Sequence, residues 1–176
     1  MEIEIKAFVK NKKDIEKKIK QTGAVLSGTG KQIDIYYNSP VKNIKGSNEY
    51  IRLRTKKGKS IFGYHINKKD YTEEHEIEVN DPKKFKQILK LTGFKELGVI
   101  EKKRKKFKYK EFEICLDDVK DIGLFIEIET DGKPNEVKEK RESCIELLEK
   151  LGISRDNLCN IWLCDIATGK TKFKKR

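Results

Sequence analysis

The sequence predicts an α+β fold in which about eight mostly antiparallel strands close into a barrel or tunnel, with helices packed on the outside. Three observations predict it: alternation of charged and aliphatic residues, a strand–helix–strand segment that occurs twice, and capping residues at both ends of the repeated helices. Alternation of period two places one kind of residue on each face of a strand. The apolar face therefore needs a cover of helices. The charged face is not explained by packing of the core.

The first predicted strand, residues 2–10, shows the alternation most clearly. Glu2, Glu4 and Lys6 share one face, and Ile3 and Ile5 share the other. Later strands repeat the charged positions in pairs, which are Arg52 and Arg54, Lys102 and Arg104, and Glu127 and Glu129. Exposed sheet faces usually mix signs and small polar residues, so we interpret the charged face as a functional site.

The repeat appears when the chain is shifted by about 70 residues, an offset read from the alignment of 11–23 with 81–93. Both segments carry helix signals. Asn11 and Asp81 are N-cap candidates, and Gly23 and Gly93 suit the left-handed position after a helix. Each predicted helix lies between two strands, so the sequence predicts two halves related by a pseudo-two-fold axis.

Further strands and one more helix complete the predicted fold. The other predicted strands are 32–38, 49–56, 60–66, 71–79, 99–109, 111–116 and 124–130. A hairpin turn is predicted at Lys57 and Gly58, and a last helix is predicted over 135–151. We expect one domain over 1–169, followed by a disordered basic tail over 170–176.

Composition narrows the class of protein. The chain has 176 residues, of which 40% are charged and 36% hydrophobic, and this suits one globular domain because the apolar residues fall in periodic segments. No apolar run approaches the roughly 20 residues of a membrane span, and the chain starts with a charged strand instead of a signal peptide. We therefore expect a cytoplasmic protein with no membrane partner.

Charge and cysteine content are less informative. The net charge of +12 suggests polyanionic partners, but lysine- and glutamate-rich chains are also common in proteins from hot environments. Exposed aromatic platforms for bases are lacking, so we do not expect a nucleic-acid partner. The four cysteines form no CxxC pair, and with two histidines they favour free thiols over a zinc site. A homodimer is compatible with the sequence.

If the barrel closes around the charged face, the buried charges need partners of opposite sign. Buried like charges repel, and cross-strand salt bridges are one remedy. The other is a ligand of both signs, with a polyphosphate for the cations and a divalent metal ion for the carboxylates. Arginine matches phosphate oxygens with a planar fork of donors, and paired glutamates suit Mg²⁺ or Mn²⁺. We favour the ligand, which makes the charged face a triphosphate site.

The same residues resemble the motifs of the CYTH superfamily, the triphosphate tunnel metalloenzymes. The matching segments, in chain order, are Glu2-x-Glu4-x-Lys6, Asp34-Ile-Tyr36, Arg52-Leu-Arg54, Glu76-Ile-Glu78, Lys102-Lys-Arg104, Leu116-Asp117-x-Val119 and Glu127-Ile-Glu129. Chain size and the segment 141–148 look most like the class IV adenylyl cyclase (CyaB-like) branch, although Cys144 replaces a tyrosine that is frequent there.

The resemblance implies a role for each charged position. The implied metal ligands for Mg²⁺ or Mn²⁺ are Glu2, Glu4, Glu127 and Glu129. The implied triphosphate contacts are Lys6, Arg52, Arg54, Lys102 and Arg104. Lys6 and Asp117 are the implied catalytic residues, with Asp117 positioning metal or water. His65 stands where the family commonly has a lysine, so we expect a weaker or pH-dependent phosphate contact there.

The resemblance also implies an activity. We expect a metal-dependent adenylate cyclase, a phosphorus–oxygen lyase that converts ATP into cyclic AMP and pyrophosphate. Two alternatives stay open. The first is a triphosphatase acting on tripolyphosphate, thiamine triphosphate or a nucleoside triphosphate. The second is a non-catalytic protein that binds triphosphates or nucleotides.

Overall fold

The computed structural model describes residues 1–68, 71–159 and 162–171. Its strands are hydrogen-bonded in the order β1-β5-β4-β3-β2-β6-β7-β8 as a closed barrel, which confirms the predicted fold class. The strands are β1 (Glu2–Phe8), β2 (Val25–Asn38), β3 (Glu49–Lys56), β4 (Lys59–Asn67), β5 (Thr72–Val79), β6 (Lys95–Tyr109), β7 (Phe112–Val119) and β8 (Gly123–Asp131). The helices are α1 (Lys12–Gln21), α2 (Pro82–Leu91), α3 (Val137–Lys150), a 3-10 helix (Arg155–Asn157) and α4 (Leu163–Ala167).

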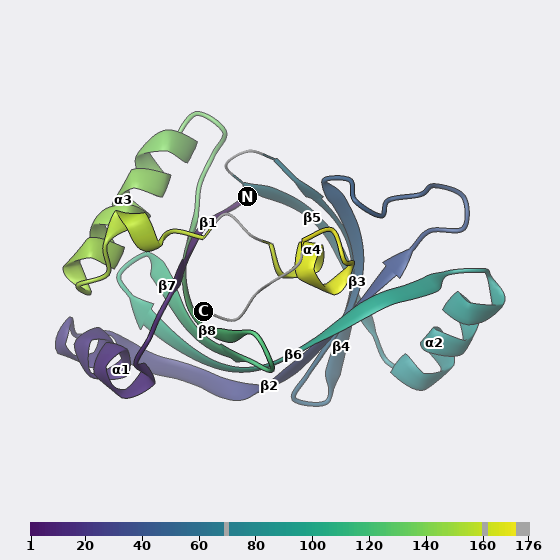
Figure 1. Ribbon diagram of the computed structural model, residues 1–176, viewed down its shortest axis with the longest axis horizontal. Coiled ribbons are helices and arrows are strands. Elements are labelled where there is room, and N and C mark those ends of the chain that lie inside the picture. The colour runs from purple at the N-terminus through teal and green to yellow at the C-terminus, as the bar shows by residue number, and fades with distance from the viewer. Residues whose placement is uncertain (69–70, 160–161, 172–176) are drawn as a thin grey trace. The chain divides into compact units, whose positions relative to one another are not determined.

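The described chain divides into two compact units, and β2 and β6 each contribute to both. Unit 1 contains residues 1–30, 71–72 and 102–159, and unit 2 contains residues 31–68, 73–101 and 162–171. Figure 1 shows the elements along the chain.

Unit 1 is a sheet with a helical cover on one face. β1 pairs with β8, β8 with β7, and β7 with the second half of β6, all antiparallel. The apolar face carries Ile5, Ile114 and Ile126, which form one buried cluster with Ile19 of α1 and Leu148 of α3. α3 packs against β1 and β8 (Figure 1). The aliphatic alternation in the sequence is therefore the core of this unit.

Unit 2 is built around the predicted hairpin. β3 and β4 pair along their whole length, and the turn residues Lys57 and Gly58 have φ angles of 50° and 78°. Two consecutive left-handed residues are the signature of a tight two-residue hairpin turn. α2 covers the apolar face, where Leu89 joins the buried cluster of Leu53, and Phe85 contacts Phe62 at a centroid distance of 4.8 Å.

The repeated helices begin and end as the sequence predicts. The Asn11 side chain accepts hydrogen bonds from the backbone N–H groups of Lys13 and Asp14, and the Asp81 side chain accepts one from Lys84. Gly23 and Gly93 have φ angles of 90° and 87°, which a residue with a Cβ rarely adopts.

Three strands extend at least three residues past a predicted boundary. β2 starts at Val25 instead of Gln32, β6 starts at Lys95 instead of Val99, and β7 continues to Val119 past the predicted end at Leu116. The early part of β2 carries no alternation of burial, because Val25 and Leu26 are 68% and 50% exposed. Periodicity detects strands only where one face is buried.

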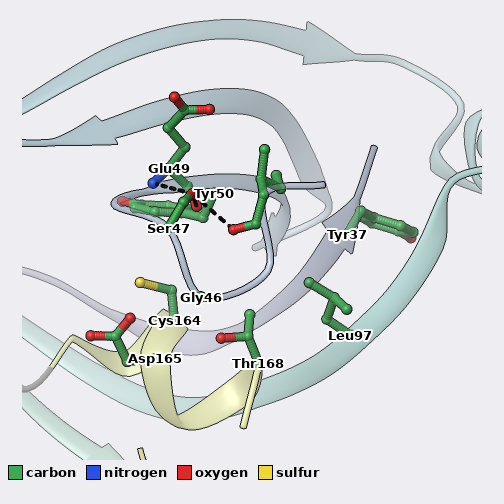
Figure 2. Close-up of a pocket in the computed structure, with 10 residues that line it drawn as sticks. Tyr37, Gly46, Ser47, Glu49, Tyr50, Leu97, Cys164, Asp165 and Thr168 are labelled. Carbon is green, nitrogen blue, oxygen red and sulfur yellow. Dashed lines mark hydrogen bonds between the residues drawn. The ribbon is translucent and has the colours of Figure 1, made fainter. Parts of the chain in front are cut away.

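The short helix α4 of unit 2 has no counterpart among the elements predicted from the sequence. It lies over a small hollow lined by Tyr37, Tyr50, Leu97 and Cys164, among others (Figure 2). Five residues are too few for a helical period to stand out.

The end of α4 is held by polar contacts within unit 2. Lys170 Nζ lies 3.3 Å from Asp165 and donates to the Ser47 carbonyl oxygen at 3.1 Å. Lys170 is the first residue of the predicted basic tail, and residues 172–176 of that tail lie outside the described residues. Among the helices that the structure describes, none is long and apolar enough to cross a lipid bilayer.

The contact of α4 with β6 predicts an effect of Gly98→Ala on stability. A Cβ at Gly98 would overlap the Ala167 carbonyl oxygen. We expect the free energy of unfolding to fall by about 1–3 kcal/mol, because overpacking displaces backbone. Gly28→Ala is the matched control, since a Cβ there meets nothing within 4 Å. Urea denaturation measures both, and equal midpoints would contradict the contact.

Candidate active site

The charged face of unit 1 gathers side chains from four strands. The register pairs Glu4 with Glu129 and Lys6 with Glu127 across β1 and β8. It pairs Arg104 of β6 with Asp117 of β7. Because alternate residues share a face, the remaining charged positions Glu2, Lys102 and Glu113 lie on the same side. The strand pattern seen in the sequence thus becomes one continuous ionic surface.

Asp117 is the centre of the buried ion pairs. Its side chain is fully buried and accepts from Lys102 Nζ at 2.5 Å and from Arg104 Nε and Nη2 at 2.7 and 2.6 Å. The two bonds from Arg104 form a fork, which fixes the guanidinium plane. Asp117 therefore holds two of the predicted phosphate-binding cations in place.

Glu127 completes this cationic half of the face. Lys6 Nζ lies 2.9 Å from Glu127, and the Arg104 guanidinium also contacts that carboxylate. Burial raises the pKa of Glu127, but Arg104, Lys102 and Lys6 outweigh it and hold the pKa well below its usual range. Burial lowers the pKa of Lys6, but Glu127 and Glu4 raise it above the ordinary lysine value. Both groups stay charged at neutral pH.

The other half of the face is rich in carboxylates. Glu2, Glu4 and Glu129 offer oxygen atoms that lie within 4.8 Å of one another. Burial raises the pKa of Glu4, and the nearby carboxylate Glu127 acts in the same direction. Burial also raises the pKa of Glu129 well above its usual value, and the carboxylates Glu2 and Glu127 add to this effect. Crowded carboxylates with raised pKa values are stabilised by a cation. An all-oxygen ligand set fits Mg²⁺ or Mn²⁺.

A second cluster on this face fits a metal ion less well. Glu113, Cys115 and Glu129 also bring their ligand atoms within 4.8 Å. However, burial raises the pKa of the Cys115 thiol far above its usual value, and Glu113 already forms an ion pair with Lys106. A thiol binds metal as the thiolate, so the cluster of Glu2, Glu4 and Glu129 is the better metal site.

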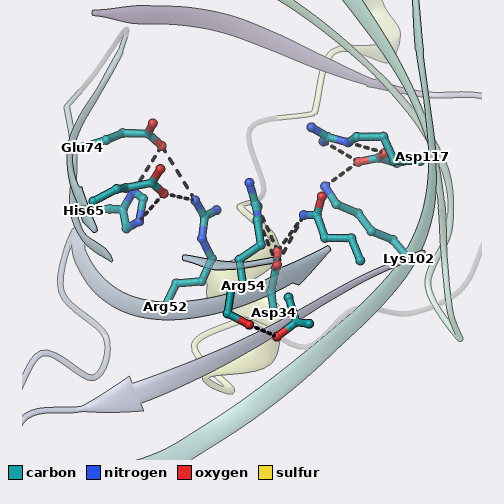
Figure 3. A network of polar contacts seen from close by, with 12 residues as sticks. Asp34, Arg52, Arg54, His65, Glu74, Lys102 and Asp117 are labelled. Atoms are coloured by element: carbon teal, nitrogen blue, oxygen red, sulfur yellow. Dashed lines mark hydrogen bonds and ion pairs between the residues drawn. The ribbon is translucent and has the colours of Figure 1, made fainter. Parts of the chain in front are cut away.

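Unit 2 holds the other predicted site residues. Arg54 donates two hydrogen bonds of 2.9 Å to Asp34, which also accepts from Gln32 (Figure 3). Arg52 Nη2 lies 3.0 Å from a Glu76 oxygen and 3.9 Å from a Glu74 oxygen. Burial lowers the pKa of Arg52, but Tyr50, Asp34 and other neighbours raise it above its usual value.

His65 joins the Arg52 side of unit 2. Its Nδ1 lies 3.1 Å from a Glu74 oxygen and its Nε2 lies 3.4 Å from a Glu76 oxygen (Figure 3). The ring stacks on Tyr50 with a centroid distance of 4.5 Å and an interplanar angle of 3°. His65 is fully buried, so these neighbours define its orientation.

The structure distributes the predicted site residues between the units. Unit 1 brings together Glu2, Glu4, Lys6, Lys102, Arg104, Asp117, Glu127 and Glu129. Unit 2 brings Arg52 next to His65 and places Arg54 on Asp34. Among the predicted metal ligands, Glu127 has the most cationic surroundings, because it contacts both Lys6 and Arg104, whereas Glu129 has a longer contact of 3.5 Å with Arg104. Its role as a ligand stays a prediction.

Three partners of the charged residues, Asp34, Glu74 and Glu113, are not among the site residues predicted from the sequence. Asp34 enters the prediction only as a motif position, and Glu74 lies two residues before the matched Glu-x-Glu pair. In the structure Glu74 and Glu76 face His65, whereas Glu78 is 71% exposed and lies 3.9 Å from Lys59. The period-two spacing of Glu74, Glu76 and Glu78 is the signal that could have identified Glu74.

The role of Asp117 predicts a large effect of Asp117→Asn on stability. The substitution leaves Arg104 and Lys102 buried with a weaker partner, and loss of one buried charge typically costs about 3–5 kcal/mol. The neighbouring Asp118→Asn is the control, because Asp118 is half exposed and pairs with Lys12 at the surface. It should cost less than about 1 kcal/mol. Similar midpoints of chemical denaturation for the two variants would contradict the assignment.

Comparison with known proteins identifies the family of the chain. The family model described as "CYTH domain" matches residues 1–160. A protein of Methanocaldococcus jannaschii named "Putative adenylate cyclase MJ0240" is 34% identical over 163 residues, which cover 90% of this chain and 93% of that protein.

Solved structures show the same fold. The PH1012 protein of Pyrococcus horikoshii is 30% identical with a TM-score of 0.82, covering 95% of this chain and 99% of that one. The PH1819 protein of the same organism is 28% identical with a TM-score of 0.86, covering 97% and 100%. The family match over most of the chain shows that this protein belongs to the CYTH domain family, a family of triphosphate-processing enzymes.

Proposed function

We propose that this protein is a metal-dependent adenylate cyclase that converts ATP into cyclic AMP and pyrophosphate. One observation carries the proposal. The charged face of unit 1 combines three buried cations with a cluster of carboxylates, as a metal-bound triphosphate requires. The relative named "Putative adenylate cyclase MJ0240", whose match covers 90% of the chain, supports this choice among the activities of the family.

The cations would hold the triphosphate. Lys6, Lys102 and Arg104 now pair with Glu127 and Asp117, and phosphate oxygens would add to these contacts at the same donors. Asp117 and Glu127 keep the donors oriented before substrate arrives, so little reorganisation is needed. Preorganised donors stabilise charge where it develops, which here is the departing pyrophosphate.

The carboxylates Glu2, Glu4 and Glu129 would hold Mg²⁺ or Mn²⁺. When bound, this ion polarises a phosphate and lowers the pKa of a hydroxyl group nearby. In the reaction the ribose 3′-oxygen forms a bond to the α-phosphorus, the bond from that phosphorus to the bridging oxygen breaks, and pyrophosphate leaves. The 3′-hydroxyl proton is released to solvent in the same step.

We also propose that Arg52 and Arg54 contact the substrate, as the sequence pattern predicts. The phosphate contact expected for His65 stays a prediction. The same scaffold also suits a triphosphatase, in which water attacks a terminal phosphorus. The two enzymes differ in nucleophile and products, so product analysis separates them.

The test is to incubate the protein with ATP, and separately with tripolyphosphate, in the presence of Mg²⁺ or Mn²⁺. Chromatography should show cyclic AMP and pyrophosphate from ATP. Orthophosphate without cyclic nucleotide would overturn the cyclase in favour of a triphosphatase. The double variant Glu2→Gln/Glu4→Gln should lose at least about 100-fold of turnover, since removing one group that stabilises the transition state costs about that factor. Glu78→Gln, at an exposed glutamate, is the control.

The fork of Arg104 predicts a specific effect of Arg104→Lys. Lysine keeps the charge but cannot form the paired bonds. Loss of a charge-assisted hydrogen bond should raise the dissociation constant for tripolyphosphate about 10-fold or more. Calorimetry measures the constant, and Arg155→Lys at a half-exposed arginine should leave it unchanged. An unchanged constant for Arg104→Lys would remove this side chain from the phosphate site.

A further inference from the structure

The cluster of His65, Glu74 and Glu76 in unit 2 contains a buried ring nitrogen that lacks a hydrogen-bond partner among the described residues. His65 Nε2 is buried and makes no hydrogen bond to any part of the chain that the structure describes. It points at a Glu76 carboxylate oxygen 3.4 Å away. Two lone pairs face each other when the ring is neutral, and a buried nitrogen without a partner is costly.

The other ring nitrogen determines which atom carries the proton. Nδ1 lies 3.1 Å from a Glu74 oxygen, and an ionised carboxylate only accepts hydrogen bonds. The contact of Nε2 with Glu76 is longer, at 3.4 Å, and does not form a hydrogen bond. We therefore place the proton of a neutral ring on Nδ1, which leaves Nε2 as an acceptor. Burial lowers the pKa of His65, and Arg52 acts in the same direction against the raising effect of Glu74. The ring is thus neutral at neutral pH.

The distances fit a shared metal ion. A Zn²⁺ ion bonds to a histidine nitrogen and a carboxylate oxygen at about 2.0–2.2 Å, so in a tetrahedral site these two atoms lie about 3.4 Å apart. The separation of His65 Nε2 and Glu76 Oε1 is 3.4 Å. A carboxylate on the opposite ring nitrogen is the usual way to orient a metal-binding histidine, and Glu74 occupies that place.

The packing beside Nε2 depends on a glycine. A Cβ at Gly63 would lie 2.5 Å from Nε2 and 2.9 Å from Glu76 Cγ, so a residue with a side chain at position 63 would occupy the place beside both groups. The Tyr50 ring fixes the imidazole plane. Two carboxylates face one guanidinium in this cluster, so an added cation would be favourable.

We propose that His65 Nε2 and Glu76 Oε1 bind one divalent transition-metal ion of the Zn²⁺ class, with Glu74 positioning the imidazole ring. Imidazole with carboxylate suits such ions better than Mg²⁺. The ligands of this site are different residues from those of the all-oxygen cluster of unit 1. It changes the expected role of His65 from a phosphate contact to a metal ligand, and it does not depend on the proposed cyclase activity.

The test uses Zn²⁺ alone, without any triphosphate, on the wild-type protein and on the Glu2→Gln/Glu4→Gln background. Calorimetry gives the affinity, and NMR follows the imidazole signals. The chain has two histidines, and His75 is exposed on the opposite face of β5 from Glu74 and Glu76. We expect Zn²⁺ to shift the signals of His65 and not those of His75, in both proteins. Zn²⁺ bound at a cysteine would leave the His65 signals in place and would overturn the proposal.

Variants made in the Glu2→Gln/Glu4→Gln protein distinguish the two proposed metal ligands from the positioning residue Glu74. His65→Gln should weaken the Zn²⁺ affinity of this site at least about 100-fold, and Glu76→Gln should weaken it at least about 10-fold. Glu74→Gln should weaken it about 10–100-fold, as expected for a residue that positions a ligand. His75→Gln should change nothing. Circular dichroism checks folding, and if His65→Gln does not fold, the partly exposed Glu76→Gln decides. Affinity equal to that of the parent in Glu76→Gln would overturn the site, whatever the outcome of the ATP assay.

Discussion

The buried pairing of Asp117 with Lys102 and Arg104 is the interaction on which the charged face of unit 1 depends. The opposite face of these strands forms the apolar core with α1 and α3, so the strands cannot turn their charges outward without exposing that core. Cations held in a buried surface need counter-charges at hydrogen-bond distance. Asp117 meets this need for two of them at once, with distances of 2.5–2.7 Å. The contacts that compensate the buried charges also orient the hydrogen-bond donors for an anionic ligand.

This compensation divides the carboxylates of the face into two groups. Glu127 lies among cations, which hold its pKa well below the usual range. Glu4 and Glu129 are cross-strand neighbours with raised pKa values, because burial and like charge are not balanced there. The protein's own cations thus complete one half of the face, while the other half gains most from an added divalent ion. An anion that carries its own metal would satisfy both halves, which is the physical basis for a triphosphate ligand.

Several features of the fold could be predicted from the sequence because they depend on local signals. Caps at Asn11 and Asp81 and the left-handed pair Lys57 and Gly58 are local signals that need no tertiary information, and the structure confirms them. The exposed start of β2 and the five-residue α4 lack such signals. Charged positions could be assigned to a face by parity, but not to partners. That Glu127 pairs with Lys6 while Glu129 lies near Glu2 follows from the strand register, and the alternation of residues in one sequence does not reveal that register.

His65 shows how a single substitution alters this kind of balance. A lysine at this position would bring a fixed positive charge to Glu74 and Glu76, and its three donors could satisfy both carboxylates. A neutral imidazole brings one donor and one acceptor, and the donor is used by Glu74 at 3.1 Å. The acceptor then faces Glu76, an arrangement that no proton donor among the described residues resolves. The proposed metal ion between the two atoms would turn this repulsion into two favourable contacts. Compared with a lysine, the histidine gives a site whose charge would depend on what binds there.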